Sequence, residues 1–105
     1  LLHRGAPVNH RNSAGESALH AASRHGNLYA VGILLLSGAA IDATTTHNWT
    51  PLHLACRYGH TDIAEHLIYR GATVNNPGFH GWTALHYAIR GGHTDCVRLL
   101  RAAGA

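Results

Sequence analysis

The sequence repeats itself every 33 residues, and this period constrains the fold more than any other feature of the chain. Three elements recur with this step: four Gly-Ala pairs, three Leu-His pairs and three further glycines. They are Gly5-Ala6, Gly38-Ala39, Gly71-Ala72 and Gly104-Ala105, then Leu19-His20, Leu52-His53 and Leu85-His86, then Gly26, Gly59 and Gly92. A fixed period of this length is typical of a row of equivalent structural units stacked on their neighbours.

Within one unit the residues predict two short helices and a loop. Thr50 is a good N-cap, and Pro51 follows at the first helical position, where its missing N–H group costs nothing. Gly59 can end this helix in the left-handed conformation. A second helix is predicted over 61–69, ended by Gly71, and the Asn, Pro and Gly residues of 72–82 favour an extended turn.

Apolar side chains lie on one side of both predicted helices. They are Leu52 and Ala55 on the first helix, and Ile63, Ala64, Leu67 and Ile68 on the second. Isolated helices shorter than about 12–15 residues are marginal in water, so these faces must be buried against neighbouring units. The chain is therefore predicted to be all-α, built from stacked helix-turn-helix units.

These motifs resemble the ankyrin repeat family over the whole chain. The segments that carry the resemblance are Thr50-Pro51-Leu52-His53-Leu54-Ala55, Gly59-His60, Leu67-Ile68 and Arg70-Gly71-Ala72-Thr73-Val74-Asn75, with equivalents 33 residues away. The resemblance implies an ankyrin repeat solenoid with projecting loops or hairpins, as a single domain over 1–105. Its parts are the tail of a preceding repeat (1–9) and three repeats (10–42, 43–75 and 76–105). Arg101 replaces the apolar Leu35 and Ile68, which is compatible with a C-terminal cap or with a cut-off fragment.

Eleven histidines are an unusual number for 105 residues, and we predict that five of them have structural roles. The resemblance implies that His20, His53 and His86 bond to the backbone of turns and neighbouring units. It also places His60 and His93 after the turn glycines, where the family commonly has histidine. Metal binding is not indicated, because the sequence lacks HExxH and neither cysteine has a second cysteine at metal-binding spacing.

Nothing in the sequence indicates an enzyme or a cofactor. The acidic residues show no pairing suited to acid–base catalysis, and the glycines are spaced as helix ends and not as a phosphate-binding loop. Cys56 and Cys96 align with small or apolar residues of the other repeats, which indicates packing. We expect both thiols to be free and the protein to lie in a reducing compartment, the cytoplasm or the nucleus.

The resemblance implies that loop tips and the exposed, concave side of the first helices bind a partner. The predicted binding residues are Glu16, Arg24, His25, His47, Trp49, Arg57, Tyr58, Phe79, His80, Trp82 and Arg90. Trp49 and Trp82 are repeat equivalents, and Arg24, Arg57 and Arg90 should form a column. Trp, Tyr and Arg are enriched at interface hot spots, and Arg favours carboxylates. Alternatively, the tryptophans pack between loops and the arginines form a solvated face.

We therefore expect a protein–protein interaction scaffold or adaptor whose partner carries an acidic segment. Two alternatives stay open: a nucleic-acid-binding module, favoured by the net charge of +3 and the mixed Arg and aromatic residues, and a non-catalytic segment of a larger enzyme or ubiquitin-ligase adaptor. Methionine is absent, even from the first position, which predicts a piece of a longer protein, so other repeats of the full-length chain are expected partners. No apolar run is long enough for a membrane span.

The resemblance also implies a modification, because ankyrin repeats are common substrates of an asparaginyl hydroxylase. Asn9 and Asn75 each follow a leucine by eight residues, Leu1 and Leu67 respectively. An acidic residue often stands two residues before the target in the family, and Pro7 and Thr73 stand there instead. Asn9 and Asn75 are predicted hydroxylation sites.

Overall fold

The computed structural model describes residues 7–105, and over this range the chain forms three pairs of antiparallel helices. The elements are α1 (Ala18–His25), α2 (Leu28–Leu36), α3 (Pro51–Arg57), α4 (Thr61–Tyr69), the 3-10 helix η1 (Phe79–Gly81), α5 (Ala84–Arg90) and α6 (Thr94–Ala102). The predicted all-α class is confirmed, and the helix predicted over 61–69 is α4.

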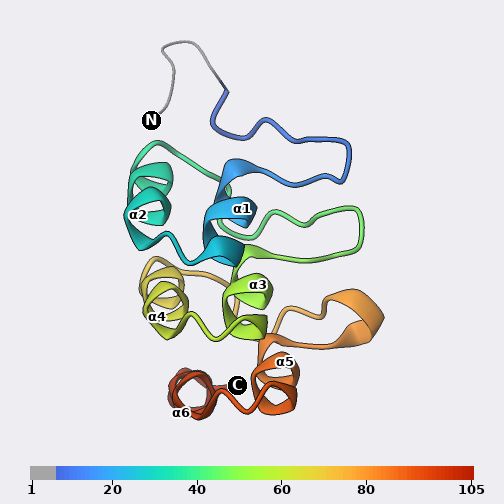
Figure 1. Cartoon of the computed structure of the whole chain (residues 1–105), viewed down its shortest axis with the longest axis vertical. Coiled ribbons are helices and arrows are strands. Elements are labelled where there is room, and N and C mark those ends of the chain that lie inside the picture. Colours follow the sequence, from blue (N-terminus) through green and yellow to red (C-terminus); the bar gives the residue numbers. More distant parts are fainter. Residues whose placement is uncertain (1–6) are drawn as a thin grey trace.

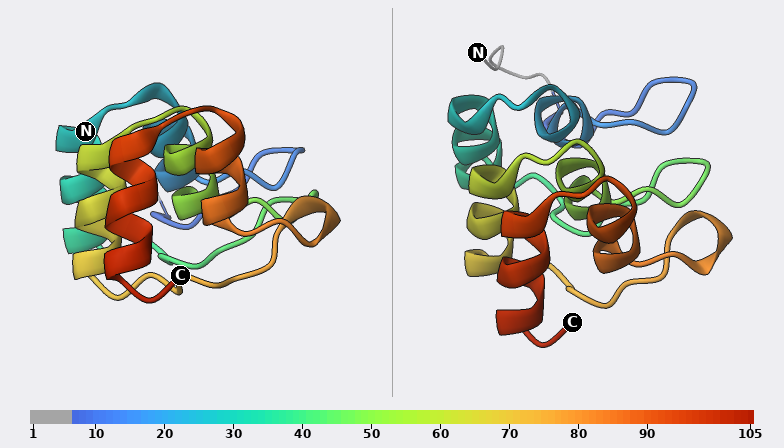
Figure 2. Two further views of the ribbon diagram at one scale, coloured as in Figure 1. Left: turned by 90° about the horizontal axis from the view of Figure 1, so that it is seen from below. Right: turned by 60° about the horizontal axis from the view of Figure 1, so that its bottom comes forward.

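The helices form two layers, which Figure 1 shows side by side. One layer, which we call the inner layer, contains α1, α3 and α5, and each of these contacts the next. The other, the outer layer, contains α2, α4 and α6, which also contact in order. The loops that precede the inner-layer helices project away from the outer layer, as both views of Figure 2 show. One side of the molecule is therefore made of loops and inner-layer helices.

The apolar core lies between the two layers. Its largest fully buried aliphatic side chains come from both layers. They are Leu19, Val31, Leu52, Ile63, Leu67 and Leu100. Ile68, predicted to be part of the inner stripe, is only partly buried against this core. His66 replaces an apolar residue of the other repeats, and its Nε2 atom is buried without a hydrogen-bond partner among residues 7–105.

Two of the three Leu-His histidines, His20 and His53, connect their repeat to the next, as the resemblance implied. The backbone N–H of Thr50 donates to Nδ1 of His53 (3.0 Å), so the neutral ring carries its proton on Nε2 and donates to the carbonyl of Asn76 (2.8 Å). In the first repeat, the backbone N–H of Ser17 likewise donates to Nδ1 of His20, and Nε2 of His20 lies 2.8 Å from the Ala43 carbonyl oxygen. These bonds fix the position of each projecting loop.

The other histidines of the expected structural group behave differently from one another. Nε2 of His60 bonds to the Arg24 carbonyl oxygen (2.9 Å), and Nε2 of His93 bonds to that of Arg57 (3.0 Å). Each of these bonds joins neighbouring repeats, which confirms the structural role. His86 bonds within its own motif to Thr83 and is exposed, and within residues 7–105 no later loop supplies a carbonyl for its Nε2 atom.

The three projecting loops close at their bases with the same local geometry. Each is closed by one backbone hydrogen bond across its base: from Asn12 to Glu16, from Thr45 to Trp49 and from Gly78 to Trp82. Each also has a left-handed residue just before its last residue: Gly15, Asn48 or Gly81, with φ between 66° and 76°. Glycine and asparagine are the residues that tolerate this conformation best, so all three loops can close in the same way despite different sequences. The third loop differs at its tip, where His80 is also left-handed (φ of +58°) within η1.

The turn glycines provide a matched test of packing between repeats. Gly59 and Gly92 are equivalents with φ of +73° and +70°, so alanine is strained equally at both, by about 1–2 kcal/mol. A Cβ atom at Gly59 would lie 2.6 Å from Nδ1 of His93, whereas nothing lies within 4 Å at Gly92. Gly59→Ala must also disturb the hydrogen bond of His93, which adds about 0.5–1.5 kcal/mol. Urea unfolding of both variants should show the larger loss for Gly59→Ala, and equal losses would contradict this account.

Candidate partner-binding surface

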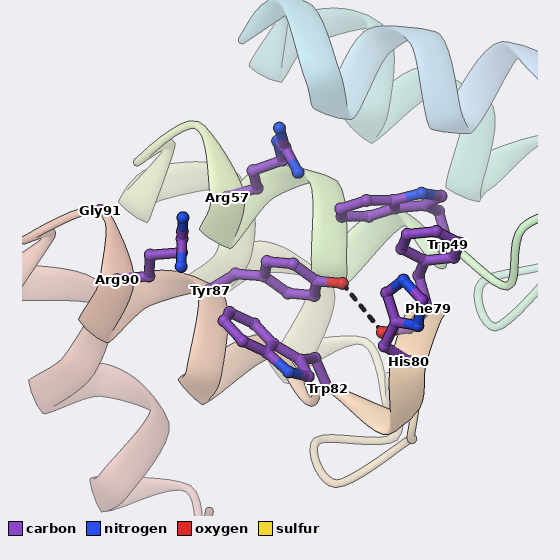
Figure 3. Close-up of a pocket in the computed structure, with 8 residues that line it drawn as sticks. All are labelled: Trp49, Arg57, Phe79, His80, Trp82, Tyr87, Arg90 and Gly91. Atoms are coloured by element: carbon purple, nitrogen blue, oxygen red, sulfur yellow. Dashed lines mark hydrogen bonds between the residues drawn. The ribbon is translucent and has the colours of Figure 1, made fainter.

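Two adjoining hollows lie on the side of the molecule formed by the loops and the inner-layer helices, which we call the loop face. The larger has a volume of about 450 Å³ and lies between the second and third repeats (Figure 3). We call it the aromatic–arginine pocket. Its lining residues are Trp49, Arg57, Phe79, His80, Trp82, Tyr87, Arg90 and Gly91. They come from two projecting loops and from α3 and α5, which the histidine bonds hold in register.

The smaller hollow has a volume of about 310 Å³ and lies between the first and second repeats. It shares Trp49 and Arg57 with the aromatic–arginine pocket, so the two hollows adjoin at these side chains. It is lined by Ala14, Glu16, Arg24, Thr45, His47, Trp49, Leu54, Arg57 and Tyr58. The two hollows together contain every predicted binding residue except His25. His25 lines a separate hollow with residues of α1 and α2, among them Ala22 and Leu34.

The aromatic side chains of the pocket pack on one another. Tyr87 lies between the two tryptophans, with ring centroids 4.7 Å from Trp49 and 5.2 Å from Trp82. Its hydroxyl donates to the Phe79 carbonyl oxygen at 3.2 Å, and burial raises the pKa of Tyr87, which keeps this donor protonated. Phe79 stacks on Trp49 with centroids 6.4 Å apart. The ring bodies therefore pack between loops, and their remaining edges line the pocket.

The arginine column is not uniform. The guanidinium of Arg24 forms an ion pair with Glu16. Arg57 lies over the Trp49 ring, 5.1 Å from its centroid, and Arg90 lies over the Trp82 ring at 5.8 Å. Attraction between a guanidinium and an aromatic face favours these positions of the two side chains at the pocket.

The sequence interpretation missed Tyr87, although this residue is the centre of the aromatic cluster. It is the fifth residue of its motif, and its equivalents are Ala21 and Leu54. The sequence did contain a signal for Tyr87, because a polar aromatic residue stands there at a position that is small or aliphatic in the other repeats. Tyr87 is 7% exposed, so its ring body belongs to the core while its hydroxyl supports the third loop.

The predicted hydroxylation sites lie in turns within the segments that join neighbouring repeats. Asn75 Nδ2 donates to the Gly104 carbonyl oxygen and Asn9 Nδ2 to that of Gly38, both at 3.3 Å. The backbone N–H of Ala40 also donates to Asn9 Oδ1 at 2.7 Å. Both asparagines are exposed, while Leu1, which sets the spacing for Asn9, lies outside the described residues. Hydroxylation at either site stays a prediction.

The two cysteines are buried and free, as expected. A hydrogen bond with the Cys96 side chain, together with burial, raises the pKa of Cys56 and keeps it a packing thiol. Within residues 7–105, no three His, Cys, Asp or Glu side chains lie close enough together to hold a metal ion. None of the helices in this range is both long and apolar enough to cross a membrane.

The comparisons with known proteins agree with this architecture. A family model described as ankyrin repeats, in three copies, matches residues 1–78 and 49–105, which together span the chain. Ankyrin repeats are generally protein–protein interaction modules. No curated protein matches the chain closely enough to count as a relative. The 33-residue period, the paired helices in two layers and this match show that the chain belongs to the ankyrin repeat family.

Proposed function

We propose that this chain is a protein-binding module that contacts its partner through the loop face. The main support is that two adjoining hollows bring together ten of the eleven residues predicted to bind, from all three repeats. Clefts that combine aromatic walls with a few convergent polar groups are the usual form of a recognition site. We further propose that the module acts in a reducing compartment, the cytoplasm or the nucleus, because Cys56 and Cys96 are free thiols.

The composition of the loop face supports a protein partner. Trp, Tyr and Arg are the residues most often found at interface hot spots, and here they are clustered between the second and third repeats. The inner-layer helices and the histidine bonds hold these side chains on a rigid scaffold. Little conformational entropy is therefore lost when a partner docks, which favours binding.

Affinity capture with matched variants tests this proposal. The chain is immobilised as wild type, as Phe79→Ala with Arg90→Ala, and as Arg70→Ala, a control at the exposed end of α4 that lines neither hollow. Proteins captured from the source cells should be recovered by wild type and Arg70→Ala, and should be reduced about tenfold by the double variant. Recovery of the same proteins by all three would contradict binding through the loop face.

The nucleic-acid alternative is separated by salt and nuclease. Binding to phosphates falls steeply with salt because counterions are released, whereas a contact centred on aromatic side chains falls much less. We expect capture to survive nuclease treatment and a gel shift with a single-stranded oligonucleotide to show no complex at low salt. A complex that forms at low salt, and that Arg57→Ala with Arg90→Ala abolishes, would favour the alternative.

A further inference from the structure

Two arginines of the aromatic–arginine pocket are free to bind a ligand. All five acidic residues of the chain lie in the described range, and the ion pairs there join Arg24 to Glu16 and Arg98 to Asp95. Neither Arg57 nor Arg90 has an acidic partner within residues 7–105. Their guanidiniums also donate no hydrogen bond to this part of the chain, while that of Arg24 donates to Glu16.

The tryptophans hold these two charges in place without neutralising them. An aromatic ring attracts a guanidinium but does not remove its charge, so the N–H groups of the guanidinium stay available to an oxygen acceptor. Arg57 and Arg90 each lie over a tryptophan ring and line the same pocket. Two unpaired guanidiniums at one pocket favour an anion with several oxygen acceptors, and a carboxylate is the anionic group that protein segments carry without modification.

The rest of the pocket favours an apolar group beside that anion. Trp49, Phe79, Trp82 and Tyr87 provide aromatic surface next to the arginines, as Figure 3 shows. The volume of about 450 Å³ is suited to one bulky side chain and its flanking backbone. An acidic group alone would leave these aromatic edges in water.

The same geometry disfavours a nucleobase. Base stacking needs open ring faces, and here Tyr87 packs between the two tryptophans, with centroids 4.7 Å and 5.2 Å away. A guanidinium lies over each tryptophan as well. A cationic ligand is disfavoured by repulsion from the two arginines. Anionic and apolar groups together match both parts of the pocket.

We propose that the aromatic–arginine pocket binds a short linear segment in which a carboxylate directly neighbours a bulky apolar side chain. The carboxylate belongs either to Asp or Glu within the segment or to a free C-terminus. This inference rests on the proposed function, because it assigns the chemistry of the partner at the loop face. The carboxylate bonds to Arg57 and Arg90, and the apolar side chain contacts the aromatic walls.

Selection from random peptides tests the assignment with defined probes. Two phage libraries are selected on the wild-type chain, one with peptides blocked at both ends by fusion and one with a free C-terminus. We expect enriched peptides that place Asp, Glu or the C-terminal carboxylate next to Leu, Ile, Phe or Trp. Enrichment in the blocked library assigns a side-chain carboxylate, and enrichment only in the other library assigns the C-terminus.

Synthetic versions of the enriched peptides then test the contacts by fluorescence polarisation. Arg57→Ala and Arg90→Ala should each weaken binding about tenfold, as should Glu→Gln in the peptide or amidation of its C-terminus. Arg70→Ala should leave the affinity unchanged within about twofold. When both arginines are replaced, removing the carboxylate charge of the peptide should weaken binding little further. The carboxylate has then already lost the arginines that it contacts. All three arginines are exposed, and circular dichroism checks that each variant keeps its helices.

The outcomes separate this inference from the proposed function. One outcome would be enriched peptides that lack a carboxylate and whose binding is weakened by Phe79→Ala but not by the arginine variants. This result would overturn the assignment of a carboxylate and leave the loop face as the binding site. Peptides insensitive to every pocket variant, or a lack of enrichment in both libraries, would overturn both. Binding of a fluorescent oligonucleotide with the same dependence on Arg57 and Arg90 would assign the pocket to nucleic acid instead.

Discussion

Acidification from about pH 7.5 to about 5.5 is expected to destabilise the repeat stack through two buried histidines. Burial is the main cause that lowers the pKa of His20 and of His53 below the ordinary 6.5, and backbone hydrogen bonds oppose it in part. A proton on Nδ1 would also face the N–H donor of Ser17 or Thr50. Below pH 6.5 the unfolded chain binds more protons than the folded one, so stability falls as pH falls.

The size of this effect follows from proton linkage. Between the ordinary pKa of 6.5 and the lower pKa of the folded state, each histidine contributes a slope of up to about 1.4 kcal/mol per pH unit. Urea denaturation at a series of pH values measures it. His53→Gln should remove about half of the slope, while the exposed His25→Gln should leave it unchanged. A free energy of unfolding that stays constant or rises on acidification would show that these rings are not held neutral.

Leu67→Ala is expected to lower the free energy of unfolding by about 2–5 kcal/mol. Leu67 is a fully buried residue of α4, and α4 contacts α2 on one side and α6 on the other. A small shift of one chain end therefore cannot fill the cavity that the shorter alanine side chain would leave. This loss is a large part of the stability of a domain of this size, which is typically about 5–15 kcal/mol. Urea unfolding followed by circular dichroism measures the change.

Leu36→Ala is the matched control, because it is the same substitution near the end of an outer-layer helix. Leu36 is 79% exposed, and its replacement should change stability by no more than about 0.5 kcal/mol. The slope of free energy against urea should be the same for both variants if unfolding stays two-state. Similar losses for Leu36 and Leu67 would mean that the two-layer core is not the main source of stability.

The local structure followed from the sequence because its causes are local. Thr50 and Pro51 start α3 where predicted, and the helix over 61–69 has the bounds that Gly59 and Gly71 imposed. Capping, proline at the first turn and glycine in the left-handed conformation depend on a few neighbouring residues. The burial of Leu52 and Leu67 followed as well, since short helices are stable only when they pack.

The candidate binding site was less predictable from the sequence. Equivalence within the repeat placed Trp49, Arg57, Trp82 and Arg90 on one face, but it treated Arg24 as a member of the same column. Only the folded chain shows that Arg24 pairs with Glu16, eight residues away, while Arg57 and Arg90 have no such partner within residues 7–105. Pairing depends on distances between side chains of a loop and a helix, which a period of 33 does not give.

By itself, the sequence determined the family, the positions of the helices and most of the apolar residues between them, because periodic apolar spacing and turn residues act over short distances. The tertiary structure alone decided which exposed residues cooperate. It placed Tyr87 between two tryptophans from different loops and placed two unpaired guanidiniums over those tryptophans. The contact between Tyr87 and Trp49 joins neighbouring repeats, and it forms only when stacking brings those repeats together.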